Sequence, residues 1–364
     1  MEFQKRILVI TNMYPSDKYP EYGIFVKRIV DGIRRHKVKV SLVSLKKVSG
    51  VLKLFSYIIF YIRSFVLYIV GGEDVVYAHY ISHVSVPIIL ANIFRKRFLV
   101  LNAHGSDLYL DNLSGFKRKV KFWLCRKSLN LSNLVVCPSE DYAQEMLVEI
   151  YDVPQRKILI SPSGGVDLNI FKNKIGISHG NEKRMLYVGR INHEKGVFDL
   201  LDALVLGEWS TMLKIDIIGN GGEKALSFLS SKIATANSKK NVFVRYFPSM
   251  NHCELSEFYS SADAFIFPSK RESLGLVGIE AMACGLPVVG SNIAGIRSYL
   301  IDNYNGILFE PGHPESLLKA VQSYLSLENK KVEAMSGNAV KTASTYNEKC
   351  VIESLLDNIF VGDR

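Results

Sequence analysis

Cysteine is scarce in this sequence of 364 residues, and its spacing excludes two kinds of small cross-linked fold. The five cysteines are odd in number, lie far apart and form no C-x-x-C pair. Neither a disulfide framework nor a zinc site is therefore supported, and a reducing compartment fits this usage. A secretory signal is also lacking, because MEFQKR leads into only a short apolar run, ILVI, typical of a buried first strand. We expect a cytoplasmic protein.

The length of the chain favours two domains, and a hydrophobic share of 48% is enough to build two cores. Apolar segments in the first half predict four parallel strands, at residues 6–11, 38–44, 74–80 and 97–105. Helical patterns lie between them, which is the alternation of a doubly wound α/β sheet. The alternation returns after residues 161–183, where the apolar periodicity lapses, so the domain boundary is expected near residue 175.

The net charge of +10 comes from the first half of the chain. Residues 1–172 carry 25 Lys and Arg against 14 Asp and Glu, whereas the remainder carries 20 against 21. One predicted helix, residues 116–127, gathers cations around aromatic side chains, including Lys117, Arg118, Lys119, Lys121 and Trp123. Each cation near an anionic leaflet contributes about 1 kcal/mol, so we expect a peripheral contact with the inner face of a membrane. A solvated basic face is the alternative; a nucleic-acid groove uses the same chemistry, but no nucleic-acid motif is found.

Residues 51–70, VLKLFSYIIFYIRSFVLYIV, are long and apolar enough to span a bilayer. Arg63 falls near the centre, where a cation costs roughly 2.5 to 3.5 kcal/mol on insertion scales. Lys53, Tyr57 and Ser64 share one arc of the helical wheel with it, as expected for a helix that lies on a surface or on a core. The segment is predicted not to span. Burial in the N-terminal domain and contact with a membrane face both fit.

The most informative stretch is residues 268–291, PSKRESLGLVGIEAMACGLPVVGS, which predicts a loop, a helix and the next strand. A turn containing Gly275 and Gly278 that leads into a helix presents backbone N–H groups and the positive end of a helix dipole, which favour an anion such as a diphosphate. Glu272 precedes this turn and Glu280 lies about one turn inside the helix. Carboxylates accept hydrogen bonds from vicinal hydroxyls, so the stretch suits a nucleotide sugar, which has a hydroxylated ring on each side of a diphosphate.

This stretch resembles the E-x7-E signature of the retaining glycosyltransferases of family 4. The resemblance implies the GT-B fold, α/β with two Rossmann-like doubly wound domains facing across a cleft. It also implies that Glu272 contacts the hydroxyls of the donor sugar and that Glu280 holds the ribose. Loop amides would bind the sugar and the phosphate, at Gly275, Leu276 and Val277.

Other segments carry the same resemblance. The sequence YVGRINHEKG places Arg190 and Lys195 like the pair that clamps the donor diphosphate in the family. Their task would be to neutralise charge on the leaving group; surface salt bridges are the alternative. Gly23, after the first strand, matches a glycine that approaches the donor phosphate, or is an ordinary turn glycine.

The segment LNAHGSD, residues 101–107, resembles the family's His-Gly-x-Asp. Its His104 would contact the donor sugar and the transition state, or would cap a strand end, and Asp107 is expected on the acceptor side. Nothing raises His79 and His83, at a neighbouring strand end, above a structural role. After the main motif the match loosens, because residues 294–298 are AGIRS where many relatives have Gly-Gly-Ile/Val-Pro-Glu.

The resemblance implies an acceptor domain over residues 1–175, a donor domain over 176–345 and a last helix, about 346–364, that returns to the first domain. The expected activity is a metal-independent, retaining transfer of the hexosyltransferase type, with no cofactor. It would move sugar from a nucleotide-diphosphate donor to a glycan or lipid-linked acceptor, in bacterial capsule or lipopolysaccharide synthesis. A GT-B epimerase, a phosphorylase and a non-catalytic partner subunit are the alternatives.

Overall fold

The computed structural model describes residues 5–19, 22–48, 50, 52–105, 107–111, 113–172 and 182–361. The chain forms two compact units. Unit 1 comprises Met1–Gly165 and Glu348–Arg364, and unit 2 comprises Val166–Asn347. The boundary predicted near residue 175 falls in the segment 173–181, outside the described residues.

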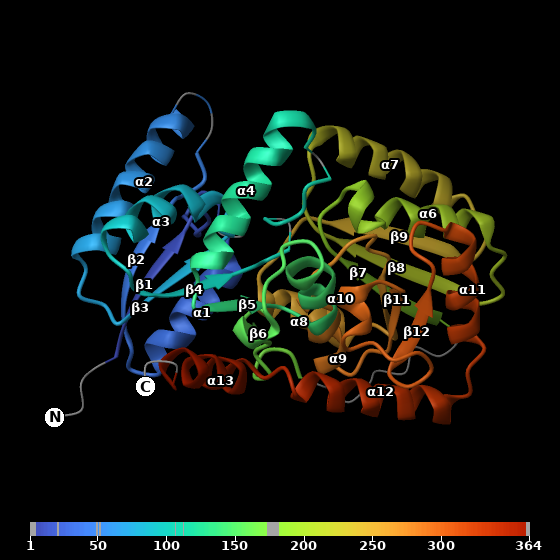
Figure 1. Ribbon diagram of the computed structural model, residues 1–364. Coiled ribbons are helices and arrows are strands. Elements are labelled where there is room, and N and C mark those ends of the chain that lie inside the picture. The colour runs from blue at the N-terminus through green and yellow to red at the C-terminus, as the bar shows by residue number, and fades with distance from the viewer. Residues whose placement is uncertain are drawn as a thin grey trace. The chain divides into compact units, whose positions relative to one another are not determined.

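Unit 1 contains a parallel sheet of six strands in the order β2-β1-β3-β4-β5-β6 (Figure 1). The strands are β1 (Arg6–Thr11), β2 (Lys39–Ser44), β3 (Val75–His79), β4 (Phe98–Asn102), β5 (Leu134–Cys137) and β6 (Ile158–Ile160). The four strands predicted in this half are confirmed to within three residues at each end. The apolar runs of β1, β3 and β4 are buried, as a parallel sheet covered by helices requires, whereas the edge strand β2 is mostly half-buried.

Helices cover both faces of this sheet. They are α1 (Ile24–Arg35), α2 (Leu52–Val70), α3 (Ile81–Phe94), α4 (Gly115–Leu131), α5 (Glu140–Tyr142), η1 (Ala143–Val148), η2 (Gln155–Lys157) and α13 (Glu348–Val361). Successive residues of a strand point to opposite faces. Accordingly Leu8 and Ile10 pack with α2, α3 and α4, whereas Ile7 and Val9 pack with α1 and α13.

Unit 2 repeats the plan with a second parallel sheet, in the order β12-β11-β10-β7-β8-β9. Its strands are β7 (Glu182–Val188), β8 (Met212–Ile218), β9 (Val242–Phe247), β10 (Ala264–Phe267), β11 (Val288–Ser291) and β12 (Gly306–Phe309). Its helices are η3 (His193–Lys195), α6 (Val197–Leu206), α7 (Glu223–Asn237), α8 (His252–Ser260), α9 (Leu276–Ala283), α10 (Ala294–Arg297), α11 (Pro314–Leu325) and α12 (Asn329–Ser344). The doubly wound α/β prediction is therefore confirmed for both halves.

The strand orders locate one switch point in each unit. The chain moves from β1 to one side for β2 and to the other side for β3, so the switch lies between β1 and β3. In unit 2 it lies between β7 and β10. Ligands of open α/β sheets bind outside the carboxyl ends of the strands at such points, because the two following loops diverge there.

Candidate active site

Two loops meet at the switch point of unit 2. One follows β7 and leads to η3, and the other follows β10 and leads to α9. The amide of Lys270 donates to the carbonyl of Glu194 at 2.8 Å. Gly196 has a φ of 69°, and a β-carbon there would lie 1.8 Å from the carbonyl oxygen of Pro268. Only glycine fits this contact, so the two loops approach each other closely through their backbones.

Lys195 and Glu272, one from each loop, form an ion pair through Nζ and Oε1. The side chains are only 18% and 13% exposed, respectively. The hydroxyl of Ser269 donates to the same carboxylate oxygen at 3.0 Å, and Asn192 Oδ1 accepts from the amide of Lys195 at 2.9 Å. The structure therefore brings together two residues that are 77 positions apart and that the sequence analysis selected separately.

Helix α9 begins at Leu276, four residues after Glu272. Gly275 caps it with a φ of 83°, and a β-carbon at that position would lie 2.6 Å from the ring of Phe267. The first amides of a helix, here at Leu276 and Val277, have no carbonyl partner within the helix and carry the positive end of its dipole. The N-terminal end of α9, whose amides and dipole favour an anion, thus lies close to the Lys195–Glu272 pair.

Two further predicted residues lie in unit 2. Glu280 is in α9 and is only 4% exposed, which is unusual for a carboxylate. Arg190 is exposed on the loop after β7, and its carbonyl accepts a hydrogen bond from the hydroxyl of Tyr187 at 3.0 Å. No ion pair joins the Arg190 side chain to an acidic residue in the part of the chain that the structure describes. Its guanidinium is thus available to a ligand at this switch point.

In unit 1 the ends of β3 and β4 bring His79 and His104 together, with 3.0 Å between Nδ1 and Nε2. His79 is completely buried, and His104 packs against the rings of Phe25 and Tyr80. Burial lowers the pKa of His104 to about 3. Burial, and then the charge of His104, hold the pKa of His79 well below its usual value. Both imidazoles are therefore neutral at pH 7.

Asp107 is buried and holds the same region by its two carboxylate oxygens. One accepts from the amide of Ile81, at the start of α3, at 2.9 Å, and the other accepts from the amide of His104 at 3.1 Å. Burial raises its pKa to about 6, although these hydrogen bonds act in the opposite direction. Asp107 thus positions His104 and the start of α3, in addition to the acceptor-side role predicted for it.

The remaining predicted residues also lie in unit 1. Gly23 has a φ of 78° at the start of α1, and a β-carbon there would lie 2.6 Å from the carbonyl of Met13. On α4, Trp123 is exposed, as are Lys117, Arg118 and Lys119. Lys121 differs from them, because its ammonium donates to the carbonyl of Tyr109 at 2.7 Å. Its side chain is turned toward its own unit.

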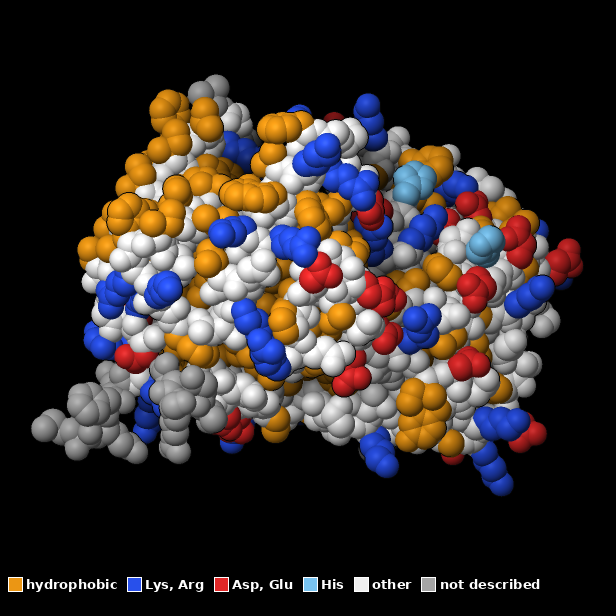
Figure 2. All heavy atoms as spheres, in the orientation of Figure 1, with side chains coloured by type: hydrophobic (Ala, Val, Ile, Leu, Met, Phe, Trp, Pro, Cys, Tyr) orange, Lys and Arg blue, Asp and Glu red, His pale blue; other side chains and the backbone are white. Residues whose placement is uncertain are grey.

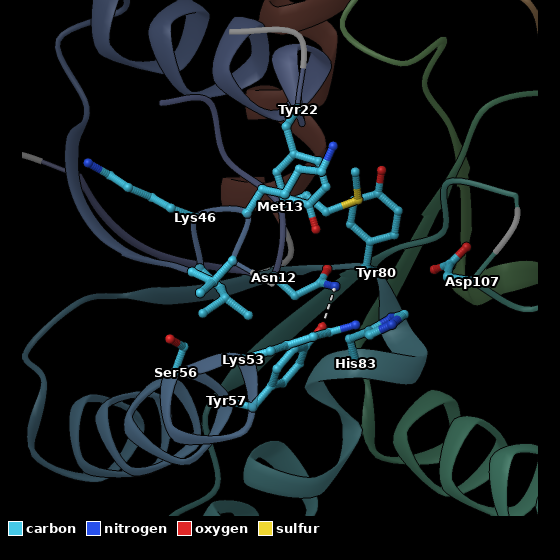
Figure 3. Close-up of a pocket in the computed structure, with 13 residues that line it drawn as sticks. Asn12, Met13, Tyr22, Lys46, Lys53, Ser56, Tyr57, Tyr80, His83 and Asp107 are labelled. Carbon is cyan, nitrogen blue, oxygen red and sulfur yellow. Dashed lines mark hydrogen bonds between the residues drawn. The ribbon is translucent and has the colours of Figure 1, made fainter. Parts of the chain in front are cut away.

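A pocket of about 320 Å³ opens at the switch point of unit 1 (Figure 3). We call it the switch-point pocket. Its lining includes Asn12 and Met13 after β1, Tyr80 after β3, Lys53 and Tyr57 of α2, and also Tyr22, Lys47, His83 and Asp107. Of these residues, only Asp107 was predicted from the sequence to belong to a site. Strand order was the missing signal, because it places the loops after β1 and β3 side by side.

Two family models match consecutive parts of the chain. Glycosyltransferase Family 4 matches residues 5–169, and Glycosyl transferases group 1 matches residues 170–342. The chain belongs to the glycosyltransferases of family 4. The D-inositol 3-phosphate glycosyltransferase of Thermomonospora curvata is 31% identical to this glycosyltransferase over 250 residues, which are 63% of this chain and 56% of that protein. The chain spans about half the length of the first curated relatives that it matches.

Solved structures share the fold of this glycosyltransferase over its whole length. Sucrose-phosphate synthase from Thermosynechococcus elongatus has a TM-score of 0.78 at 17% identity, covering 99% of this chain and 100% of that one. Anabaena HepE, solved with UDP and glucose, has a TM-score of 0.74 at 16% identity and the same coverage. The predicted GT-B architecture of two Rossmann-like domains is thereby confirmed.

Proposed function

We propose that this family 4 glycosyltransferase moves a sugar from a nucleotide-diphosphate sugar to a glycan or lipid-linked acceptor, with retention of the anomeric configuration and without a metal ion. The observation that carries the proposal is the Lys195–Glu272 pair beside the start of α9. A cation, a carboxylate and a helix N-terminus at one switch point match the phosphate and the hydroxyls of such a donor.

Each donor-site residue has a task in this proposal. Lys195, Arg190 and the first amides of α9 neutralise the diphosphate. Glu272 accepts from hydroxyls of the transferred sugar, and Glu280 holds the ribose. In the structure Lys195 forms its ion pair with Glu272. Donor binding therefore exchanges one ion pair for two contacts, phosphate to Lys195 and sugar hydroxyl to Glu272.

The chemistry assigned here is a same-face substitution. The acceptor hydroxyl attacks the anomeric carbon beside the departing phosphate, and a phosphate oxygen takes the proton. Lys195 and Arg190 stabilise the negative charge that grows on the leaving diphosphate. Such preorganised electrostatic stabilisation is usually the largest single contribution to catalysis. We assign His104 of unit 1 the contact with the donor sugar and give no residue the role of nucleophile.

Similar proteins suggest which substrates to test. The neighbours HepE and the pneumococcal O-GlcNAc transferase GtfA were solved with UDP and a sugar. A uridine nucleotide is therefore the first donor to test. Several relatives are named for a phosphorylated acceptor, D-inositol 3-phosphate. The WaaB neighbour is a lipopolysaccharide outer core galactosyltransferase, in keeping with the role in surface polysaccharide synthesis proposed here.

An apolar face of unit 1 supports a peripheral place at the inner face of the membrane (Figure 2). Helix α2 is long and apolar enough to cross a membrane by length and composition, and only 17% of that stretch is buried. It packs on α3 and β2 through Phe60, Ser64 and Tyr68, so it belongs to the helical layer of unit 1. We propose that α2 lies flat on the lipid, with the cations of α4 beside it.

Anomeric configuration tests the proposed reaction. With UDP-sugars, a chelator and a lipid-linked or glycan acceptor, NMR of the product should show the donor's own anomeric configuration. Glu272→Ala should lower turnover at least ten-fold, about 1.4 kcal/mol in the barrier. Glu257→Ala, on α8 of the same unit, is the matched control and should keep wild-type turnover. Inversion, a chelator-sensitive rate or a fully active Glu272→Ala enzyme would each contradict the proposal.

A further inference from the structure

The switch-point pocket of unit 1 has a cationic side, on which the Lys47 ammonium also lies over the rings of Tyr19 and Tyr22, 4.4 and 5.9 Å from their centroids. Lys47 and Lys53 line it, and no ion pair joins either of them to an acidic side chain among the described residues. Figure 3 shows Lys53 reaching across the pocket toward His83, whereas Lys46 extends away. Asp107 is the one acidic residue among the described lining residues, and both of its carboxylate oxygens accept hydrogen bonds from backbone amides.

The pocket also contains a buried polar atom whose hydrogen bond is missing. Asn12 is 3% exposed, and its side-chain nitrogen donates to the hydroxyl of Tyr57 at 3.4 Å. Its Oδ1 has no partner within the described part of the protein. A buried acceptor without a donor costs roughly 1 to 3 kcal/mol, so the site favours a ligand that brings a hydroxyl to Asn12. Cations and an acceptor of this kind suit a ligand with a phosphate and a hydroxyl.

A second hollow adjoins this pocket. We call it the α3–α4 groove; it has a volume of about 460 Å³ and is lined by Ser82, His83, Leu113, Phe116, Lys117, Val120, Lys121 and Leu124. His83 lines both spaces. Burial and the charges of Lys121 and Lys53 lower its pKa, so a neutral imidazole separates the cationic pocket from the apolar groove.

The groove continues onto the exposed apolar face of unit 1. Phe116 and Val120 line it and are themselves exposed, and α3, which carries Ser82 and His83, packs against both α2 and α4. A polar head in the pocket would therefore place an attached chain along α4 and beside the apolar surface of α2. A hydrophilic sugar phosphate would leave this groove empty.

We propose that the switch-point pocket and the α3–α4 groove form one binding site for an amphiphilic phosphate ester, such as a prenyl phosphate or diphosphate that carries a sugar. Lys47 and Lys53 bind the phosphate, Asn12 accepts a hydrogen bond from a sugar hydroxyl, and the groove holds the apolar chain. The inference rests on the proposed function, because this ligand is the acceptor of the transfer, and it narrows the acceptor to one class.

Binding of farnesyl diphosphate to the full chain tests the site, with inorganic pyrophosphate and farnesol as its two halves. Calorimetry should give farnesyl diphosphate at least ten-fold tighter binding than either half. Lys53→Ala or Lys47→Ala should weaken it about ten-fold, and Lys39→Ala, on the exposed edge strand β2, should not. Val120→Asp should weaken the binding of farnesyl diphosphate but not that of pyrophosphate, whereas Ile301→Asp, at an exposed position of unit 2, should change neither.

Pyrophosphate binding as tight as that of farnesyl diphosphate would overturn the inference, since it would show a site for free phosphate only. Equal binding by the Lys53→Ala and Lys39→Ala proteins would also overturn it. UDP binding to the same proteins separates the two proposals. If the protein binds UDP but not farnesyl diphosphate, the acceptor site alone is refuted. If it binds farnesyl diphosphate but not UDP, the result counts against the donor site alone.

Discussion

At the scale of single residues, His79 shows how a buried pair couples folding to pH. Its pKa in the folded protein is well below 6.5, the value near which it titrates when unfolded. Below pH 6.5 the unfolded chain therefore binds a proton that the folded chain does not, and stability falls as pH falls. We expect this histidine to lower the free energy of unfolding progressively as the pH falls below about 6.5.

Urea unfolding at several pH values measures this slope. His79→Gln should be less stable than the wild type at pH 7 and should lose less stability on acidification, because the titrating group is gone. His313→Gln provides the matched control, since His313 is exposed at the start of α11, and it should keep the wild-type slope. A His79→Gln slope identical to the wild-type slope would contradict the argument.

The same residues mark what sequence can and cannot predict. Glu272 and Lys195 were selected because each stands in a motif whose chemistry can be recognised locally. His79 was not, because its importance arises from β3 and β4 being neighbours, which only the strand order reveals. Asn12 and Lys53 were missed as site residues for the same reason: they come from different elements and meet only in the folded unit.

At the scale of elements, the strands could be predicted from the sequence, but which side of α2 faces the protein could not. Apolar runs of four to seven residues determine parallel strands, because both faces must be covered. On α2 the polar arc indicated a helix that lies on a surface or on a core, and it left burial and contact with a membrane face both open. In the structure Ser64 is buried, whereas Ile59 and Ile62 are each 58% exposed. A helix of a protein surrounded by water normally has the opposite arrangement.

This inverted helix gives a prediction for membranes. Sedimentation with vesicles of neutral and anionic phospholipid should capture the protein, and Ile59→Asp with Ile62→Asp should reduce the bound fraction at least ten-fold, because charged groups enter the acyl boundary at high cost. Changing Lys117, Arg118 and Lys119 to Gln should weaken binding roughly five-fold per cation and remove its sensitivity to salt, at about 1 kcal/mol each.

Ile301→Asp serves as the matched control, because Ile301 is similarly exposed but lies in unit 2. It should bind vesicles like the wild type. Equal sedimentation of all these proteins would refute the membrane face. Loss of binding in the α4 variant but not in the α2 variant would instead assign the contact to charge alone.

At the scale of the whole molecule, the two units are expected to respond to different ligands. The donor site is built from the loops after β7 and β10, all within unit 2. A ligand that binds only the folded state stabilises by about 2.7 kcal/mol at a hundred times its dissociation constant. UDP should therefore slow amide hydrogen exchange through the sheet of unit 2 about a hundred-fold, and a chelator should not change the effect, because Lys195, Arg190 and α9 provide the positive charge.

Lys195→Met should abolish most of this protection, whereas Lys330→Met, on the exposed side of α12 in the same unit, should retain it. Protection that requires a divalent cation, or that survives Lys195→Met in full, would show that UDP is bound by groups other than those assigned here.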